Sequence, residues 1–369
     1  MTKASVHKTV LALLCAIGAA FCAQALPATA FASSSKLASG RWVKISIPDN
    51  GVYQITYDEL QAMGFSAPQN VRIFGQGGGL MSELLDGSHI DDLQPVPVMR
   101  QNNKIIFYGK GPVSFTYDQT FSRKDNGYDT AGYYFLTEAT SAEPTIAVSA
   151  ATTASGTPVS TSIDYFWHER DLCTLSYSGR QLLGEDITVD NAAIDFYLPQ
   201  LSSTSVNVRT VYAAQVSELA QVNAAIVTGG NRQELPYTAT IAAPGSNYIF
   251  YRIASPQADV DLASLQQRGQ LETGITPTAG VINSAKLDYF IITYQHNNIL
   301  PSDNDNQLRM GFPAATTSQP VMLPGAGSNV VVWNVDNPLA PVSMTLTQAA
   351  GNPMRSWLSL SLGRMLLCW

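Results

Sequence analysis

Residues 42–55 read WVKISIPDNGVYQI, a run in which apolar and polar residues alternate on both sides of a turn. Val43, Ile45 and Ile47 fall on one face of an extended strand. The next four residues are Pro, Asp, Asn and Gly, which favour tight turns, and the alternation resumes at Val52. This segment therefore predicts two strands joined by a short connection.

The same alternation recurs along the chain between polar turns. It predicts further strands at 71–74, 105–108, 133–136, 194–198, 206–212, 287–294 and 330–333. The segment 287–294 is apolar on both faces, which indicates a central strand. Because the sequence has neither heptads nor an alternation of strands and helices, we predict a mainly β fold. We expect two consecutive β-sandwich or jelly-roll-like domains with a few short helices.

One helix has clear end signals. Thr56 is a suitable N-cap, and Glu59 stands three residues later, where a capping-box partner belongs. Gly64 can end the helix in a left-handed conformation. The sequence therefore predicts a helix over 57–63.

Composition shifts divide the chain. Residues 139–161 are mostly Ala, Ser, Thr and Pro, which is typical of a surface link. The last residues, from 353 on, are nearly continuously apolar and do not alternate. We expect a signal peptide at 1–32, an N-terminal β-rich domain at 38–140, a linker at 141–157, a second β-sandwich-like domain at 158–340 and an irregular, truncated tail at 341–369.

The first residues have the pattern of a secretory signal peptide. Lys3 and Lys8 precede an apolar run over 10–25, and Ala-x-Ala sites follow at 28–30 and 30–32. We expect cleavage after Ala32 and export to the periplasm, the outer-membrane surface or the medium. A retained anchor is the alternative. Because no later apolar run approaches 18 residues, we expect no membrane span after the signal is removed.

The charge of the chain bears on its partners, and its cysteine content bears on disulfide bonds. Acidic residues outnumber basic ones, 28 to 21, and the basic residues form no cluster, so we expect no nucleic-acid partner. Two of the four cysteines lie in the signal segment. The other two, Cys173 and Cys368, are too few and too far apart to form a disulfide framework.

Two local patterns are candidates for catalysis or phosphate binding. The glycine-rich segment 75–79 follows a strand, as a phosphate loop does, but it lacks the Lys-Ser/Thr ending, so a tight turn explains it better. His168 and Cys173 could form the base and thiol of a peptidase. A structural thiol is the simpler interpretation, because both residues lie in one local stretch.

Two Asp- and Asn-rich segments are candidates for a calcium site. The first contains Asp303 and Asp305, and the second contains Asp125 and Asp129. Neither has the glycine and the bidentate acid of an EF-hand, and Asx turns are the simpler explanation of both. We expect no other metal and no cofactor.

Several short segments share their order with one known family. They are GRWVKI at 40–45, NGVYQITYDEL at 50–60, VRIFGQGG at 71–78, FYGKGPV at 107–113, GYYFLT at 132–137, HERD at 168–171, SGR at 178–180 with GE at 184–185, LDYF at 287–290 and WNVDNP at 333–338. Together they resemble the N-terminal region of the type IX secretion sortases. These are gingipain-type cysteine peptidases of the Bacteroidota that act at the cell surface. The resemblance covers residues 40–345.

The resemblance implies non-catalytic β modules. In that family a caspase-like domain follows these modules and carries the catalytic His and Cys, and no residue here matches either. The full enzymes cleave the C-terminal secretion signal of cargo, so the implied partners are secretion components or cargo proteins. Two alternatives stay open: a free-standing secreted β-protein that binds glycan or protein, and a peptidase that uses Cys173.

Overall fold

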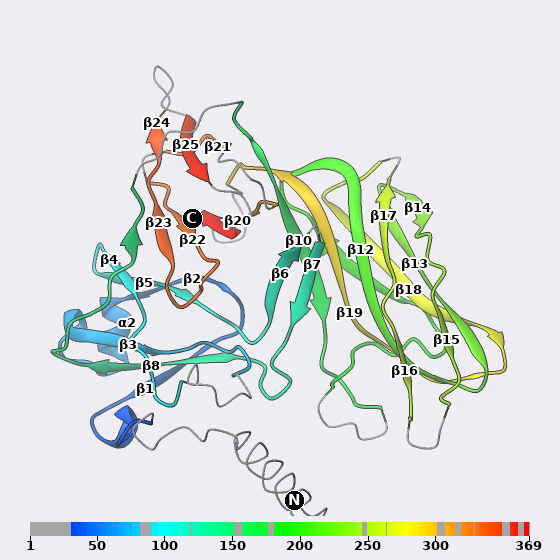
Figure 1. Cartoon of the computed structure of the whole chain (residues 1–369), viewed down its shortest axis with the longest axis horizontal. Helices are drawn as coiled ribbons and strands as arrows, with labels where there is room; N and C mark the ends of the chain where they lie inside the picture. The colour runs from blue at the N-terminus through cyan, green and yellow to red at the C-terminus, as the bar shows by residue number, and fades with distance from the viewer. Residues whose placement is uncertain are drawn as a thin grey trace, which may run out of the picture.

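The computed structural model describes twelve segments of the chain. They are residues 31–81, 90–118, 120–150, 157–175, 181–245, 249–262, 264–300, 307–313, 319–327, 329–348, 355–360 and 365–368. Most of these residues lie in strands, and the mainly β class is confirmed. In Figure 1 the N-terminal strands lie to the left of a sandwich drawn in green and yellow, and the last strands, in orange and red, lie above them.

The N-terminal unit consists of two small sheets around one core. Its elements are η2 (Lys36–Ala38), β1 (Val43–Ile47), β2 (Gly51–Thr56), α2 (Tyr57–Ala62), η3 (Pro68–Asn70), β3 (Val71–Gly75), β4 (Val98–Gln101), β5 (Lys104–Gly109) and β8 (Gly132–Glu138). The sheet orders are β1-β8-β3 and β2-β5-β4, all antiparallel. Ile47, Ile73 and Phe107 pack between them as the alternation predicts.

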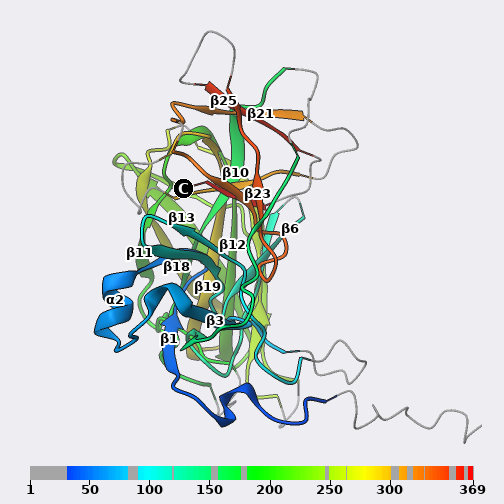
Figure 2. The same ribbon diagram turned by 90° about the vertical axis from the view of Figure 1, so that its left-hand side faces the viewer.

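Helix α2 begins and ends at the predicted signals. The Thr56 hydroxyl accepts from the Glu59 backbone N–H at 3.1 Å, and the Thr56 N–H donates back to Glu59 Oε2 at 2.7 Å. Gly64 has a φ of +89°, which a residue with a side chain rarely adopts. In Figure 2 this helix lies on the outside of the molecule, below β21 and β25.

The central unit is a sandwich of two antiparallel sheets. One sheet contains β10 (Thr161–Glu169), β12 (Leu201–Val216), β16 (Arg252–Ala254), β17 (Gln257–Asp261) and β19 (Ile282–Asn297). The other contains β11 (Ala192–Tyr197), β13 (Leu219–Thr228), β14 (Asn231–Glu234), β15 (Thr240–Ala242) and β18 (Arg268–Ala279). As predicted, 287–294 is central, since β19 pairs with β10 on one side and β12 on the other.

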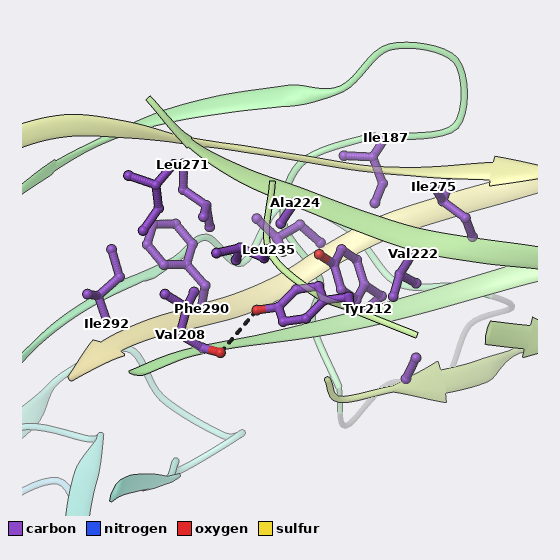
Figure 3. Packing of buried hydrophobic residues seen from close by; sticks show 14 of the residues in the cluster. Ile187, Val208, Tyr212, Val222, Ala224, Leu235, Leu271, Ile275, Phe290 and Ile292 are labelled. Carbon is purple, nitrogen blue, oxygen red and sulfur yellow. Dashed lines mark hydrogen bonds between the residues drawn. The ribbon is translucent and has the colours of Figure 1, made fainter. Parts of the chain in front are cut away.

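The sandwich core is built from the inward-facing side chains of its two sheets. Val208 and Tyr212 on β12 and Phe290 on β19 face Val222 and Leu271 of the other sheet, and all five are buried (Figure 3). The buried Tyr212 hydroxyl lies 2.5 Å from Thr273 Oγ1, so the phenol does not bury an unsatisfied polar group. Two apolar faces packed in this way give the unit its own hydrophobic core.

A third group of strands lies above the N-terminal unit. It contains β9 (Ala147–Val148), β20 (Leu308–Gly311), β21 (Gln319–Pro324), β22 (Val332–Asn334), β23 (Val342–Met344), β24 (Thr347–Gln348), β25 (Arg355–Leu360) and β26 (Met365–Cys368). Strand β26 pairs with β20 on one side and β22 on the other. It thereby joins the large sheet of the sandwich to β22, β23 and β9.

The structure differs here from the irregular tail expected at 341–369. Four strands occupy parts of that segment, and β9 lies within the expected linker at 141–157. Strands β23, β25 and β26 each lie between two partners, which satisfy their backbone N–H and C=O groups on both sides, and this does not require side-chain alternation. The alternation pattern therefore missed these strands.

The N-terminal unit also contacts the sandwich. Its hairpin, β6 (Ser114–Asp118) and β7 (Thr120–Lys124), lies on the outer face of the sandwich, where Phe115 and Phe121 place their rings 4.1 Å and 4.5 Å from that of Tyr165. The N-terminal unit also contacts the third group of strands, because the buried Trp333 of β22 lies in the same apolar cluster as Ile106 of β5. Within the described segments, no helix is long and apolar enough to cross a membrane.

Candidate functional site

The candidate site lies where β10 ends beside β19. Beyond Glu169, the segment 183–187 takes the place of β10: Gly184 N donates to Leu287 O at 2.7 Å, and Leu287 N donates to Glu185 O at 3.0 Å. A Cβ on Gly184 would lie only 3.0 Å from Leu287 O and 3.1 Å from Arg170 O, so a side chain here would force these backbone groups to shift. Three of the family-like segments, 168–171, 184–185 and 287–290, therefore meet at one place.

A β-bulge places an acid at this junction. Val211 lies opposite Tyr289, whereas the next residue, Tyr212, lies opposite Leu287, so Asp288 is an extra residue on β19. The bulge lets both Leu287 and Phe290 face the sandwich core. The side chain of the extra residue, Asp288, is only 5% exposed.

In the described part of the chain, the side chain of Gln181 donates to Asp288. Gln181 Nε2 donates to Asp288 Oδ2 at 2.9 Å, and the Tyr251 hydroxyl donates to Gln181 Oε1 at 3.1 Å. Among the described residues, no donor reaches Asp288 Oδ1. Burial raises the pKa of Asp288 to about 6; the Gln181 bond and the charge of Arg123 oppose the rise, and the acids Asp125 and Asp171 add to it.

Arg123 reaches the site from the N-terminal hairpin. Its guanidinium pairs with Glu169, and both side chains are 8% exposed. It also lies 3.4 Å from Asp125 and stacks 4.7 Å above the ring of Tyr289. Its Nε is buried without a hydrogen-bond partner. The hairpin is therefore fixed to the sandwich by a buried ion pair as well as by aromatic packing.

On the core side of the junction, His168 binds Glu185. His168 Nε2 lies 2.9 Å from Glu185 Oε1, and the imidazole stacks on Phe290 with the ring centroids 5.5 Å apart. The Arg170 guanidinium lies 3.8 Å from the same carboxylate. Glu185 Oε2 is buried and has no partner. We name these groups the acid cluster: Arg123, Asp125, His168, Glu169, Arg170, Asp171, Glu185 and Asp288.

The structure does not bring the predicted peptidase pair together. Cys173 Sγ lies 3.7 Å from Leu183 O, and the side chain packs among apolar neighbours. The His168 ring has its own partner in Glu185. Neither interaction joins the thiol to the imidazole, which is the contact that would activate the thiol as a nucleophile.

The remaining candidates from the sequence are the two calcium segments and the glycine-rich phosphate loop. Asp303 and Asp305 lie outside the described residues. Asp129 Oδ1 accepts from the backbone N–H of Ala131 at 3.3 Å, as in an Asx turn. In the described segments, no three His, Cys, Asp or Glu side chains are placed to hold a metal ion. The glycine-rich segment packs closely: a Cβ on Gly78 would lie 2.6 Å from Pro112 N.

Sequence reasoning missed Asp288 and Arg123 as site residues. Asp288 belongs to a family-like segment, but only the bulge buries its carboxyl. The strand 161–169 carries no signal that it pairs with 289–297, so the convergence of the segments was not visible. The cluster holds five carboxyl groups against two guanidinium groups, and this excess of negative charge favours cations.

Comparisons with known proteins include a strong structural likeness. No family model matches the sequence, and no curated protein matches it significantly. The structure of a β-porphyranase, BpGH86A from Bacteroides plebeius, shares 9% identity with this chain over 69% of this chain and 34% of its own, with a TM-score of 0.25. The structure of infectious bursal disease virus, Gx strain, shares 13% identity over 81% of this chain and 59% of its own, with a TM-score of 0.23. Both TM-scores are too low for any inference. The crystal structure of dimeric latent PorU from Porphyromonas gingivalis is similar to this chain, with a TM-score of 0.77 and 22% sequence identity. The match covers 92% of this chain and 32% of that chain, so this chain spans about a third of PorU. This chain therefore has the fold of that part of PorU.

Proposed function

We propose that this chain is an exported, non-catalytic β module of a protein similar to the type IX secretion sortases. The observation that carries the proposal is the likeness to PorU, with a TM-score of 0.77 over 92% of the chain. The order of the family-like segments supports it independently. Because the match spans 32% of PorU, the activity of the whole protein does not transfer with the fold.

The physical role of such a module is to hold and present surfaces. The two β-rich units, with proposed boundaries at 38–140 and 158–340, contact each other through Phe115, Phe121 and the pair of Arg123 with Glu169. A rigid platform of this kind can position a peptidase domain or its cargo without taking part in the chemistry. Export follows from the signal-like start, with residue 33 as the proposed mature N-terminus.

A chimera tests the proposal. This chain replaces the matching third of PorU, and the hybrid is assayed for cleavage of a cargo protein that carries a C-terminal secretion signal. We expect the hybrid to fold and to retain cleavage, because the module supplies the same surfaces. A hybrid that folds but does not cleave would contradict the equivalence of the two modules.

The DNA that follows the codon of Trp369 gives a second test. A coding region for a gingipain-type peptidase domain directly downstream is the expected result. Its absence would favour the free-standing binding protein instead.

A further inference from the structure

A buried histidine lies at the boundary between the sandwich and the third group of strands. His296, near the end of β19, is 0% exposed. Its neighbours Ser162 on β10 and Asn298 just beyond β19 are 3% and 1% exposed. Because an imidazole can change its charge near neutral pH, a histidine in such a place can make the surrounding contacts depend on pH.

The three side chains form a chain of hydrogen bonds. His296 Nδ1 lies 3.0 Å from the backbone carbonyl of Asn297. A carbonyl can only accept, so Nδ1 carries the proton of the neutral ring. His296 Nε2 lies 3.0 Å from Ser162 Oγ, and the Ser162 hydroxyl lies 2.6 Å from Asn298 Oδ1. A buried histidine of β19 is thus connected through β10 to Asn298.

Asn298 connects this chain to β21. Its Nδ2 donates to Met322 O at 3.2 Å and to Val159 O at 3.4 Å. Since both of these partners are carbonyls, the Oδ1 of the amide is the atom that faces Ser162. Met322 N also donates to Val159 O, at 2.8 Å. We call these five residues the junction: Val159, Ser162, His296, Asn298 and Met322.

The junction has one hydroxyl hydrogen for two acceptors. Both His296 Nε2 and Asn298 Oδ1 can accept from Ser162. The bond to Asn298 is the shorter, so the hydroxyl donates there, and the neutral ring presents the lone pair of Nε2 to the Ser162 oxygen. A proton added at Nε2 would be donated to that oxygen, so the geometry already offers it a place.

The charges around the ring oppose the uptake of that proton. Burial lowers the pKa of His296, and the charge of Arg309 on β20 adds to this fall. Asp164 on β10 and the Asn297 carbonyl oppose the fall. Asp164 already accepts from Arg309 Nε at 2.6 Å and from the Tyr294 hydroxyl at 3.4 Å. Because 201–208 of β12 and 319–324 of β21 carry no charged residue, they do not compensate a cationic ring.

The third group of strands is tied to β10 less extensively than β19 is. Strand β19 pairs with β10 from Thr161 to Glu169, whereas in the described segments β20 pairs with it at Ile163. Further ties are the bonds of Arg309 to Asp164 and Tyr165 O, and those of the junction. Separation at the junction therefore brings water to the ring with a smaller loss of strand pairing than separation of β10 from β19.

We propose that the junction is an acid-sensitive contact: a proton taken up by His296 Nε2 opens it and releases β20 and β21 from the sandwich. An exposed histidine titrates near pH 6.5, so the open state binds the proton more tightly than the closed state does. The closed state therefore loses stability as the pH falls below about 6.5. One pH unit below that value, the population of the open state rises by up to about 10-fold.

Hydrogen exchange of the full mature chain tests the proposal. Exchange is followed by mass spectrometry at about pH 7.5 and about pH 5.5, and the rates are corrected for the intrinsic effect of pH. We expect peptides that cover 157–163 and 319–324 to lose protection by up to about 10-fold at the lower pH. Residues 219–228 of β13, in the opposite sheet, should keep their protection.

Two matched variants assign the effect to one histidine. His296→Gln keeps a donor and an acceptor but cannot take up a proton, so it should abolish the acid response. His168→Gln removes the histidine at the other end of β10 and should leave the acid response of the junction unchanged. Nuclear magnetic resonance titration of the wild-type His296 ring is a second measurement that does not depend on how the variants fold. Its midpoint should lie below about 6.5.

Any of four results would overturn the proposal. The first is unchanged protection of 157–163 and 319–324 in the wild type at the lower pH, and the second is an equal acid response in His296→Gln. The third is an equal loss of protection in 219–228, because the whole sandwich would then be opening. The fourth is a midpoint of the His296 ring at or above about 6.5, because the closed state would then hold the proton at least as tightly as the open state.

Discussion

Replacing Asp288 with Asn should change how the stability of the protein depends on pH. The folded protein holds this carboxyl with a pKa of about 6, whereas an unfolded chain leaves it near 4. Between these values the folded state binds the proton more tightly than the unfolded state does. The free energy of unfolding therefore decreases as the pH rises from about 4 to about 6, and it stays lower above that range.

The magnitude follows from the size of the shift. Each pKa unit corresponds to about 1.4 kcal/mol, so a rise of about 2 units costs about 3 kcal/mol at neutral pH. Asn cannot ionise, but its side-chain oxygen still accepts from Gln181. The variant should gain up to about 3 kcal/mol relative to the wild type between pH 4 and pH 7.

Urea denaturation at one-unit intervals from pH 4 to pH 8 measures this difference. The curves of stability against pH for the wild type and the variant should diverge between pH 4 and pH 6 and run parallel above pH 7. Asp190→Asn, whose carboxyl is exposed, serves as the control and should follow the wild type. Parallel curves for Asp288→Asn over the whole range would refute the assignment of a buried, protonatable acid to this bulge.

Three further predictions concern the fold around the site. Gly184→Ala should lower the free energy of unfolding, measured by urea denaturation, by about 1–3 kcal/mol, because the added Cβ would press on the carbonyls of Leu287 and Arg170. An unchanged midpoint of denaturation would contradict the close approach. Phe121→Ala should lower the free energy of unfolding by about 3–5 kcal/mol, since the ring is 1% exposed and packs on Tyr165. A decrease of less than about 1 kcal/mol would mean that the hairpin does not pack there. In a fragment of residues 31–140, the hairpin β6–β7 should lose its protection from hydrogen exchange, because its partner Tyr165 is missing; equal protection in the fragment and the full chain would contradict the contact between the units.

The parts of the fold that could be predicted are those with local signals. Thr56, Glu59 and Gly64 specify the ends of α2 through contacts within one turn of the chain. The apolar run at 287–294 indicates a central strand because both of its faces are covered. Both signals depend only on neighbouring residues, so they can be read without the tertiary structure.

The candidate site could not be predicted because it depends on register. The extra residue at Asp288 appears only when β19 is aligned with β12, and nothing in the sequence sets that alignment. Arg123 reaches Glu169 only because the hairpin of one unit packs on the other. Strand β26 was missed for a similar reason, since its pairing with β20 and β22 joins segments that are distant in the sequence.

A peptidase assay on the mature chain alone tests the proposed non-catalytic role most directly. Purified residues 33–369 and the Cys173→Ala variant are each incubated with a cargo protein that carries a C-terminal secretion signal. We predict no cleavage by either protein, because His168 is bound to Glu185 and the thiol of Cys173 lies against Leu183 O. Cleavage by the wild type that disappears in Cys173→Ala would contradict the account and identify this chain as a peptidase.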